Sequence, residues 1–162
     1  MNVTVAPVLD TTRDVSTAAE MLQPYLVEVI GLHLAAKQLH WTVTGREFLP
    51  LHGALDHLAA DAHGYADEVA EHLAAIGVAP DARLATLASS ALPSLPGGFL
   101  TGEEAVSLVL ERLSILIERS RGLVAGLAGL DPVGQDLALR VLACFEKHLW
   151  MFRVQAGSHY GR

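Results

Sequence analysis

Four long segments with helical periodicity, separated by short stretches of glycine and proline, constrain the fold of this chain more than any other feature. No segment alternates apolar and polar residues at the period of two that a half-buried strand requires. The stripe of the first segment instead advances by three and four residues, as one face of an α-helix does. That largely apolar stripe consists of Leu22, Leu26, Val29, His33, Ala36, His40 and Val43. The chain is therefore predicted to be all-α.

Local capping signals predict where the helices begin. Thr17 and Thr101 each stand three residues before a glutamate, which is typical of a capping box, although Pro24 offers a second starting point for the first helix. Asp131-Pro132 is typical of an N-cap followed by proline at the first helical position. With glycine and proline as stop signals, the expected helices cover residues 17–43, 50–76, 101–127 and 132–156.

Only one connector between the expected helices is long. It covers residues 81–100 and contains a stretch, Leu84–Ser90, that can form a short helix, while the prolines and glycines between Pro93 and Gly98 exclude a longer one. Four helices with one long connection are typical of a four-helix bundle with a crossover between helices two and three. We expect an extended N-terminal arm over residues 1–15, the bundle over 16–157 and a C-terminal tail over 158–162.

Several candidate metal ligands are spaced so that no single subunit can bring them together. Four of them lie within roughly a 100° stripe of the second helix. Yet His52 and Asp67 are 15 positions apart, which separates them by about 22 Å on a helix rising ~1.5 Å per residue. Two antiparallel copies of the helix, related by a two-fold axis, can close a site that one copy cannot. The candidate ligands are His40, His52, Asp56, Asp67 and Glu71.

The chemistry of these ligands narrows the choice of metal. Two imidazoles and three carboxylates form a mixed nitrogen and oxygen set, which suits Fe, Mn or Zn. A di-iron site inside one bundle normally uses histidines preceded by glutamate three residues earlier. None of the eight histidines here has glutamate at that position, so a site shared between chains is what remains.

Charge and composition argue against nucleic-acid and membrane partners. The net charge is −7, and the only lysines are Lys37 and Lys147, so the overall field repels phosphate backbones. No apolar run reaches the ~18 residues that cross a bilayer, and the N-terminus lacks a signal-peptide pattern. The single cysteine, Cys144, excludes an intrachain disulfide and favours a reducing cytoplasm; we expect it to pack in the core.

Three motifs surround the candidate ligands. The segment Lys37–Phe48 reads K-x-x-H-W-x-V-x-G-x-x-F, Leu51–Asp56 reads L-H-x-x-x-D, and Asp67–Glu71 reads D-x-x-A-E. These motifs resemble the Dps family of mini-ferritins, and the likeness extends over about residues 20–156. The resemblance implies a ferritin-like bundle that assembles into a hollow dodecamer. It also implies a ferroxidase centre between subunits, with the ligands His40, His52 and Asp56 from one chain and Asp67 and Glu71 from its two-fold mate.

The function implied by this resemblance is oxidation of Fe(II), in the family preferentially by hydrogen peroxide, followed by storage of ferric mineral and protection against oxidative damage. Zinc or manganese is expected to compete with iron. One alternative is a DNA-compacting protein of the nucleoid. The family generally uses a lysine-rich terminus for this function, and a dodecamer with a net charge of about twelve times −7 would repel DNA. The other alternative is a scaffold whose histidines only pack. The expected location is the cytoplasm, with nucleoid association if DNA is bound.

Four further residues are candidate accessory positions. Trp41, next to His40, is either an electron-transfer residue or a core or interface aromatic, and His63 is placed to meet its own copy near the two-fold axis. Asp131 and Asp136 either line an acidic pore for iron or serve to cap and complement the fourth helix.

The remaining histidines are expected to have structural roles. The family's arginine after Ala-Glu is His72 here, for which we expect a solvent-facing or interface position. His33 is expected to be a hydrogen-bonded core histidine, His148 to pack, and His57 to be solvated.

Overall fold

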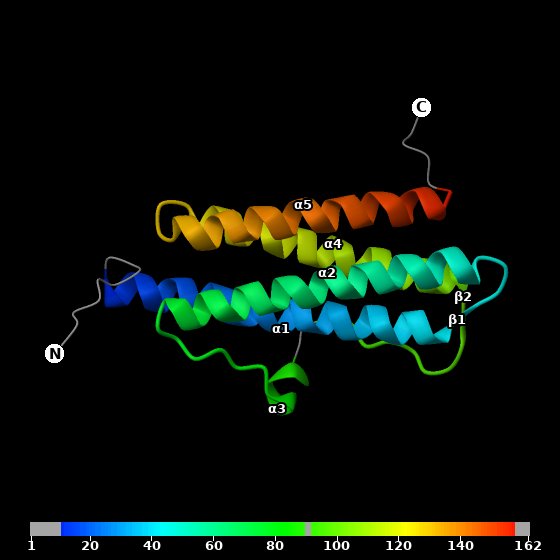
Figure 1. Cartoon of the computed structure of the whole chain (residues 1–162), viewed down its shortest axis with the longest axis horizontal. Helices are drawn as coiled ribbons and strands as arrows, with labels where there is room; N and C mark the ends of the chain where they lie inside the picture. The colour runs from blue at the N-terminus through cyan, green and yellow to red at the C-terminus, as the bar shows by residue number, and fades with distance from the viewer. Residues whose placement is uncertain (1–10, 90–91, 158–162) are drawn as a thin grey trace.

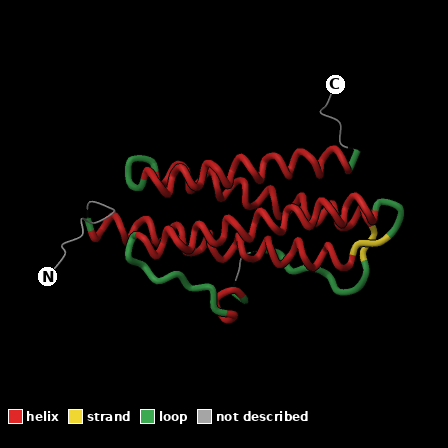
Figure 2. Tube along the Cα trace, in the orientation of Figure 1, coloured by secondary structure: helices red, strands yellow, loops and turns green. Residues whose placement is uncertain are grey.

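The computed structural model describes residues 11–89 and 92–157, so most of the expected N-terminal arm and the expected tail over 158–162 lie outside the described residues. Within the described ranges, the long helices lie side by side, and the connector carries a short helix that lies outside the bundle and contacts α1 (Figures 1 and 2). The elements are α1 (Thr12–Thr42), β1 (Val43–Thr44), α2 (Phe48–Ala75), α3 (Leu84–Leu87), β2 (Leu100–Thr101), α4 (Gly102–Leu127) and α5 (Pro132–Gln155). The predicted all-α bundle with an extra helix in the crossover is confirmed.

The long connector carries the chain from one end of the bundle to the other. The helix α1 packs along α2 and α4 packs along α5, each pair joined by a short turn (Figure 1). The chain then leaves α2 at one end and returns to begin α4 at the opposite end. Because of this crossover, α2 and α4 run in the same direction.

The first helix begins earlier than expected. Thr11 is its N-cap, and the Thr11 hydroxyl accepts a hydrogen bond of 3.1 Å from the amide of Asp14. Thr17 is already inside the helix, where its hydroxyl donates to the carbonyl of Arg13, so the expected capping box at this position is wrong. The expected arm therefore loses residues 12–15 to α1. Two threonines in the same short segment can each cap a helix, and only packing decides between them.

Most of the other helix ends follow their local signals. Thr101 and Glu104 form the predicted capping box, and Asp131 caps α5 by accepting from the amide of Gly134. The second helix is the exception: it begins at Phe48, so the expected start at Pro50 is wrong by two residues. It ends in a Schellman motif, in which Gly77 has φ +90 and the amide of Val78 donates to the carbonyl of Leu73.

Two very short strands, unexpected from the sequence, lock one end of the bundle. The strands β1 and β2 pair in parallel, with Val43 opposite Leu100 and Thr44 opposite Thr101. The Thr44 hydroxyl also donates to the Leu100 carbonyl at 3.0 Å. A strand of two residues is too short to show a period of two in the sequence. The pairing fixes the end of α1 to the start of α4.

The core lies between the four long helices and is almost entirely aliphatic. Its largest buried side chains include Leu22, Leu26, Leu39, Leu55, Leu58, Leu73, Leu113, Phe145 and Phe152. Arg112 is buried among them and donates to the carbonyls of Leu108 and Pro93, which ties the connector to α4. None of the described helices combines the length and apolar character needed to cross a membrane.

Candidate metal centre

The end of α1 and the start of α2 hold two histidines in a reciprocal arrangement. Nδ1 of His40 donates to the backbone carbonyl of His52 at 2.8 Å, and Nδ1 of His52 donates to the carbonyl of His40 at 2.9 Å. Because a carbonyl oxygen can only accept, both Nδ1 atoms carry a proton, and in the neutral form of each ring the lone pair is therefore on Nε2. Metal-binding histidines in proteins are typically held by a hydrogen bond of this kind from the other ring nitrogen.

Packing fixes the orientation of the same two rings. Their centroids are 3.6 Å apart with an interplanar angle of 21°, so the imidazoles are stacked. The ring of Phe48 lies 4.9 Å from that of His52. His40 is buried and His52 is half-buried, which limits the water that competes for their nitrogen atoms.

Asp56 lies one helical turn after His52 and is engaged by a lysine. The Nζ atom of Lys37 is 2.7 Å from Oδ1 of Asp56, and Nδ1 of His40 is 4.0 Å from the same oxygen. The hydrogen bond from Lys37, with its charge, holds the pKa of the Asp56 carboxyl below its usual range. A metal ion that binds Asp56 has to share or displace the ammonium group. Lys37 also lies 5.8 Å from the ring centroid of Trp41, which is 62% exposed.

The two remaining candidate ligands lie far along α2. Asp67 and Glu71 are exposed, on the part of the helix that leads away from His52. Among the described residues, no three of the five predicted ligands bring their ligand atoms within 4.8 Å of one another. In one subunit the candidate ligands therefore form two separate groups, and both the metal site and the two-fold arrangement that would join the groups stay predictions.

His72 does not occupy the position expected of it, and Asp131 takes one of its two expected roles. Nε2 of His72 lies 2.6 Å from Oδ2 of Asp131, and both side chains are buried. The expectation of a solvent-facing or interface position for His72 is thus wrong. Asp131 is fully buried and caps α5, so the capping alternative holds and a pore-lining role in this conformation does not. Its partner is 59 positions away in the sequence, and no local signal identifies it.

The other accessory residues are exposed or hydrogen-bonded. Asp136 is exposed and pairs with Arg140 at 3.1 Å, so a role at a pore stays a prediction. His63 is exposed, with its ring 5.3 Å from that of His33. His33 is hydrogen-bonded as expected, through Nδ1 and the carbonyl of Ala59 at 2.9 Å, but it is half-buried and not part of the core.

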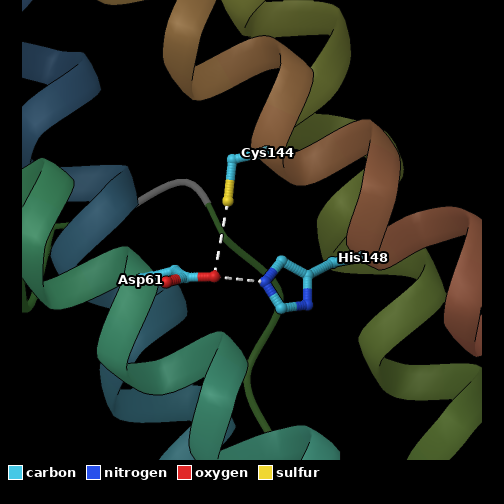
Figure 3. Close-up of side chains that lie close together, drawn as sticks. All are labelled: Asp61, Cys144 and His148. Atoms are coloured by element: carbon cyan, nitrogen blue, oxygen red, sulfur yellow. Dashed lines mark hydrogen bonds and ion pairs between the residues drawn. The ribbon is translucent and has the colours of Figure 1, made fainter.

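A second group of potential ligands was missed from the sequence. Asp61 on α2 lies against Cys144 and His148 on α5, and the ligand atoms of all three lie within 4.8 Å of one another (Figure 3). From the sequence, we expected Cys144 and His148 only to pack. Cys144 and His148 are four residues apart and so share one face of a helix, and this spacing was the only sign in the sequence that they could bind one ligand. The position of Asp61 opposite them depends on how α2 packs against α5.

Comparison with known proteins agrees with this geometry. A family described as a ferritin-like domain matches residues 19–158, so the bundle is a ferritin-like fold. The DNA protection during starvation protein of Mycolicibacterium smegmatis is 30% identical over 151 residues, covering 91% of this chain and 81% of that protein. Protein 2 of the same name from Deinococcus radiodurans is 32% identical over 143 residues, covering 88% of this chain but only 59% of that longer relative.

Solved structures point in the same direction. The structure of Mycobacterium smegmatis Dps has a TM-score of 0.90 and 29% identity, covering 100% of this chain and 93% of that one. Dps from Microbacterium arborescens, described as the high iron form, has a TM-score of 0.88 and 26% identity, covering 94% of this chain and 99% of that one. The chain belongs to the Dps family of mini-ferritins.

Proposed function

We propose that this chain is a ferroxidase and iron-storage protein, which oxidises Fe(II) at a site between subunits and stores the product as ferric mineral. The observation that carries the proposal is the reciprocal hydrogen bonding of His40 and His52, which uses Nδ1 of both rings and leaves Nε2 of each neutral ring as the atom that can bind a metal. Asp56 adds a carboxylate beside them.

The second half of the site is proposed to come from another copy of the chain. Asp67 and Glu71 are exposed in the subunit, and carboxylates of this kind complete an iron site when a two-fold mate presents them. Large apolar side chains on α1 and α2 also need a partner: Leu34 is 52%, Trp41 62% and Leu49 77% exposed. Both observations support a homo-oligomer, for which the family resemblance implies a dodecamer.

The proposed chemistry is a two-electron reduction of hydrogen peroxide. Two Fe(II) ions each give one electron, and peroxide with two protons becomes two molecules of water. Carboxylates bind Fe(III) more strongly than Fe(II), so the ligand set favours the oxidised product. Taking both electrons at one site avoids the release of hydroxyl radical. Zinc and manganese are expected to compete for the same ligands, and Trp41 to lie within electron-transfer reach.

Stopped-flow oxidation of Fe(II) by hydrogen peroxide tests the proposal. We expect the combined substitution His40→Ala and His52→Ala to lower the initial rate at least ~10-fold, since removing a residue that only orients a metal ligand already costs that much. The matched control is His57→Ala, which removes an exposed histidine of the same helix. All variants are compared as assembled particles of equal size. Equal rates in the double variant and the wild type would end the ferroxidase proposal.

The relatives are named for protection of DNA during starvation. We infer that this chain protects DNA by removing Fe(II) and peroxide and not by contact. The acidic net charge of −7 supports this, because charges of one sign repel the phosphate backbone. The competing function, DNA compaction, requires local contacts strong enough to overcome that field.

A further inference from the structure

A cluster of three different ligand types lies between α2 and α5, away from the histidine pair at the end of α1. Nε2 of His148 is 2.7 Å from Oδ2 of Asp61, and Sγ of Cys144 is 3.5 Å from the same oxygen. In Figure 3 the three side chains converge on that carboxylate, Asp61 from one helix and the other two from the facing one.

Burial gives the cluster a closed side and an open side. The side chain of His148 is 3% exposed, whereas that of Asp61 is 50% exposed. An ion can therefore reach the carboxylate from solvent while the imidazole and the thiol approach from within the bundle. The cluster is neither an acidic patch nor an isolated cysteine, because one nitrogen, one oxygen and one sulfur ligand meet at one point.

Catalysis by the thiol does not account for the cluster. Burial and the neighbouring Asp61 carboxylate raise the pKa of the Cys144 thiol to about 11, so the group stays protonated and is a poor nucleophile near neutral pH. A divalent cation reverses this preference, because it binds the thiolate and offsets the charge of the carboxylate.

We propose that Asp61, Cys144 and His148 form a second metal site that binds Zn²⁺, separate from the proposed iron site. Zinc accepts nitrogen, oxygen and sulfur ligands together in a tetrahedral arrangement, and three protein ligands leave the fourth position for water. With bonds of about 2.0–2.3 Å, tetrahedral ligands lie roughly 3.3–3.8 Å apart. The sulfur-to-oxygen distance already fits, and the shorter nitrogen-to-oxygen contact opens when the ion replaces the hydrogen bond.

Proton accounting predicts that the ion is exchangeable. Binding releases the proton of the Cys144 thiol, and the imidazole proton of His148 moves from Nε2 to Nδ1. That Nδ1 atom is buried and has no hydrogen-bond partner among the described residues. An unpaired buried donor is unfavourable, so the affinity is lower than at a closed structural site. The bound ion links α2 to α5.

Cobalt is the probe of choice, because it occupies zinc sites and gives a sulfur-to-metal charge-transfer band. The chain has one cysteine, so any such band reports on Cys144 alone, even if cobalt also binds at the His40 and His52 site. The experiment titrates Co²⁺ into the full-length, reduced, metal-free assembly and then adds Zn²⁺. We expect the charge-transfer band to saturate at one Co²⁺ per subunit and to disappear when Zn²⁺ is added.

Substitutions separate this site from chance binding. Cys144→Ser should remove the band, and Asp61→Asn and His148→Gln should each weaken cobalt binding at least ~10-fold. Glu146→Gln, on the exposed face of α5, is the matched control and should leave the titration unchanged. Asp61→Asn alters an exposed side chain and is least able to disturb folding.

Two results would overturn the proposal. One is the absence of a charge-transfer band when a thiol assay after denaturation shows that the cysteine is reduced. The other is a band that persists at wild-type affinity in both Asp61→Asn and His148→Gln. Neither result bears on iron oxidation, since the stopped-flow variants change other residues.

Discussion

The buried pair of His72 and Asp131 gives the sharpest test of how this fold supports its proposed iron site. Glu71, a candidate ligand, is the neighbour of His72, and the pair fixes that end of α2 to the start of α5. Asp131 has two roles: Oδ1 accepts from the amide of Gly134 at 3.0 Å, and Oδ2 accepts from Nε2 of His72 at 2.6 Å. Substituting Asp131 therefore separates the capping contribution from the pairing contribution.

The expected loss of stability is the sum of two contributions. Removing an N-cap costs about 1 kcal/mol. Leaving a buried donor without its partner costs about 1–3 kcal/mol. We therefore expect Asp131→Ala to lower the free energy of unfolding by about 2–4 kcal/mol, or roughly 4–16 °C in melting temperature for a chain of this size. Asp131→Asn keeps the capping oxygen, so its cost should be about 1–3 kcal/mol.

Thermal and guanidinium unfolding at one fixed protein concentration measures these differences, because an assembly's stability depends on concentration. Asp136→Asn is the control: it removes an exposed carboxylate of the same helix and should change stability by less than about 0.5 kcal/mol. The double variant His72→Gln with Asp131→Asn should cost less than the sum of the single changes, since neither partner is then left alone. If Asp131→Ala is no more harmful than Asp136→Asn, the pair does not stabilise the fold and the reasoning fails.

Three further predictions concern charge and titration. Lys37→Met should tighten anaerobic Fe(II) binding about two- to five-fold, because the ion no longer competes with the ammonium at Asp56. The pH below which Fe(II) binding is lost should also rise, because the depressed pKa of Asp56 returns toward its usual value. Unchanged binding, or an equal change in Lys147→Met, would contradict this. Alkylation of Cys144 by iodoacetamide at pH 8 should be roughly 200-fold slower in the folded protein than in guanidinium, since a pKa of about 11 leaves about one thiolate in a thousand; equal rates would show that burial does not suppress the thiolate. In a gel-shift assay at low salt the assembly should not retard plasmid DNA, and retardation would mean that local contacts outweigh the net charge of −7.

Features of the fold that depend only on residues close together in the sequence could be predicted from it. The capping box at Thr101, the Asp131 cap followed by Pro132 and the glycine stop at Gly77 all lie within a few positions of the helix ends they define. The start of α1 was misplaced because Thr11 and Thr17 offer competing caps. The two-residue strands were missed because pairing between Val43 and Leu100 leaves no periodic trace in either segment.

The sequence singled out His40 and His52 as candidate ligands, and the family resemblance implied that one chain brings them together. It could not show that each ring donates to the other residue's carbonyl, because that depends on how the end of α1 meets the start of α2. The exposure of Asp67 and Glu71 is likewise seen only in the folded subunit.

The all-α class and the ligand spacing along α2 were thus determined by the sequence alone, because helical geometry converts residue number directly into angle and rise. The tertiary structure decided which distant side chains meet: His72 with Asp131 over 59 positions, and Asp61 with His148 over 87. Such contacts depend on the crossing and register of packed helices, and these are set by the whole core and not by any segment within it.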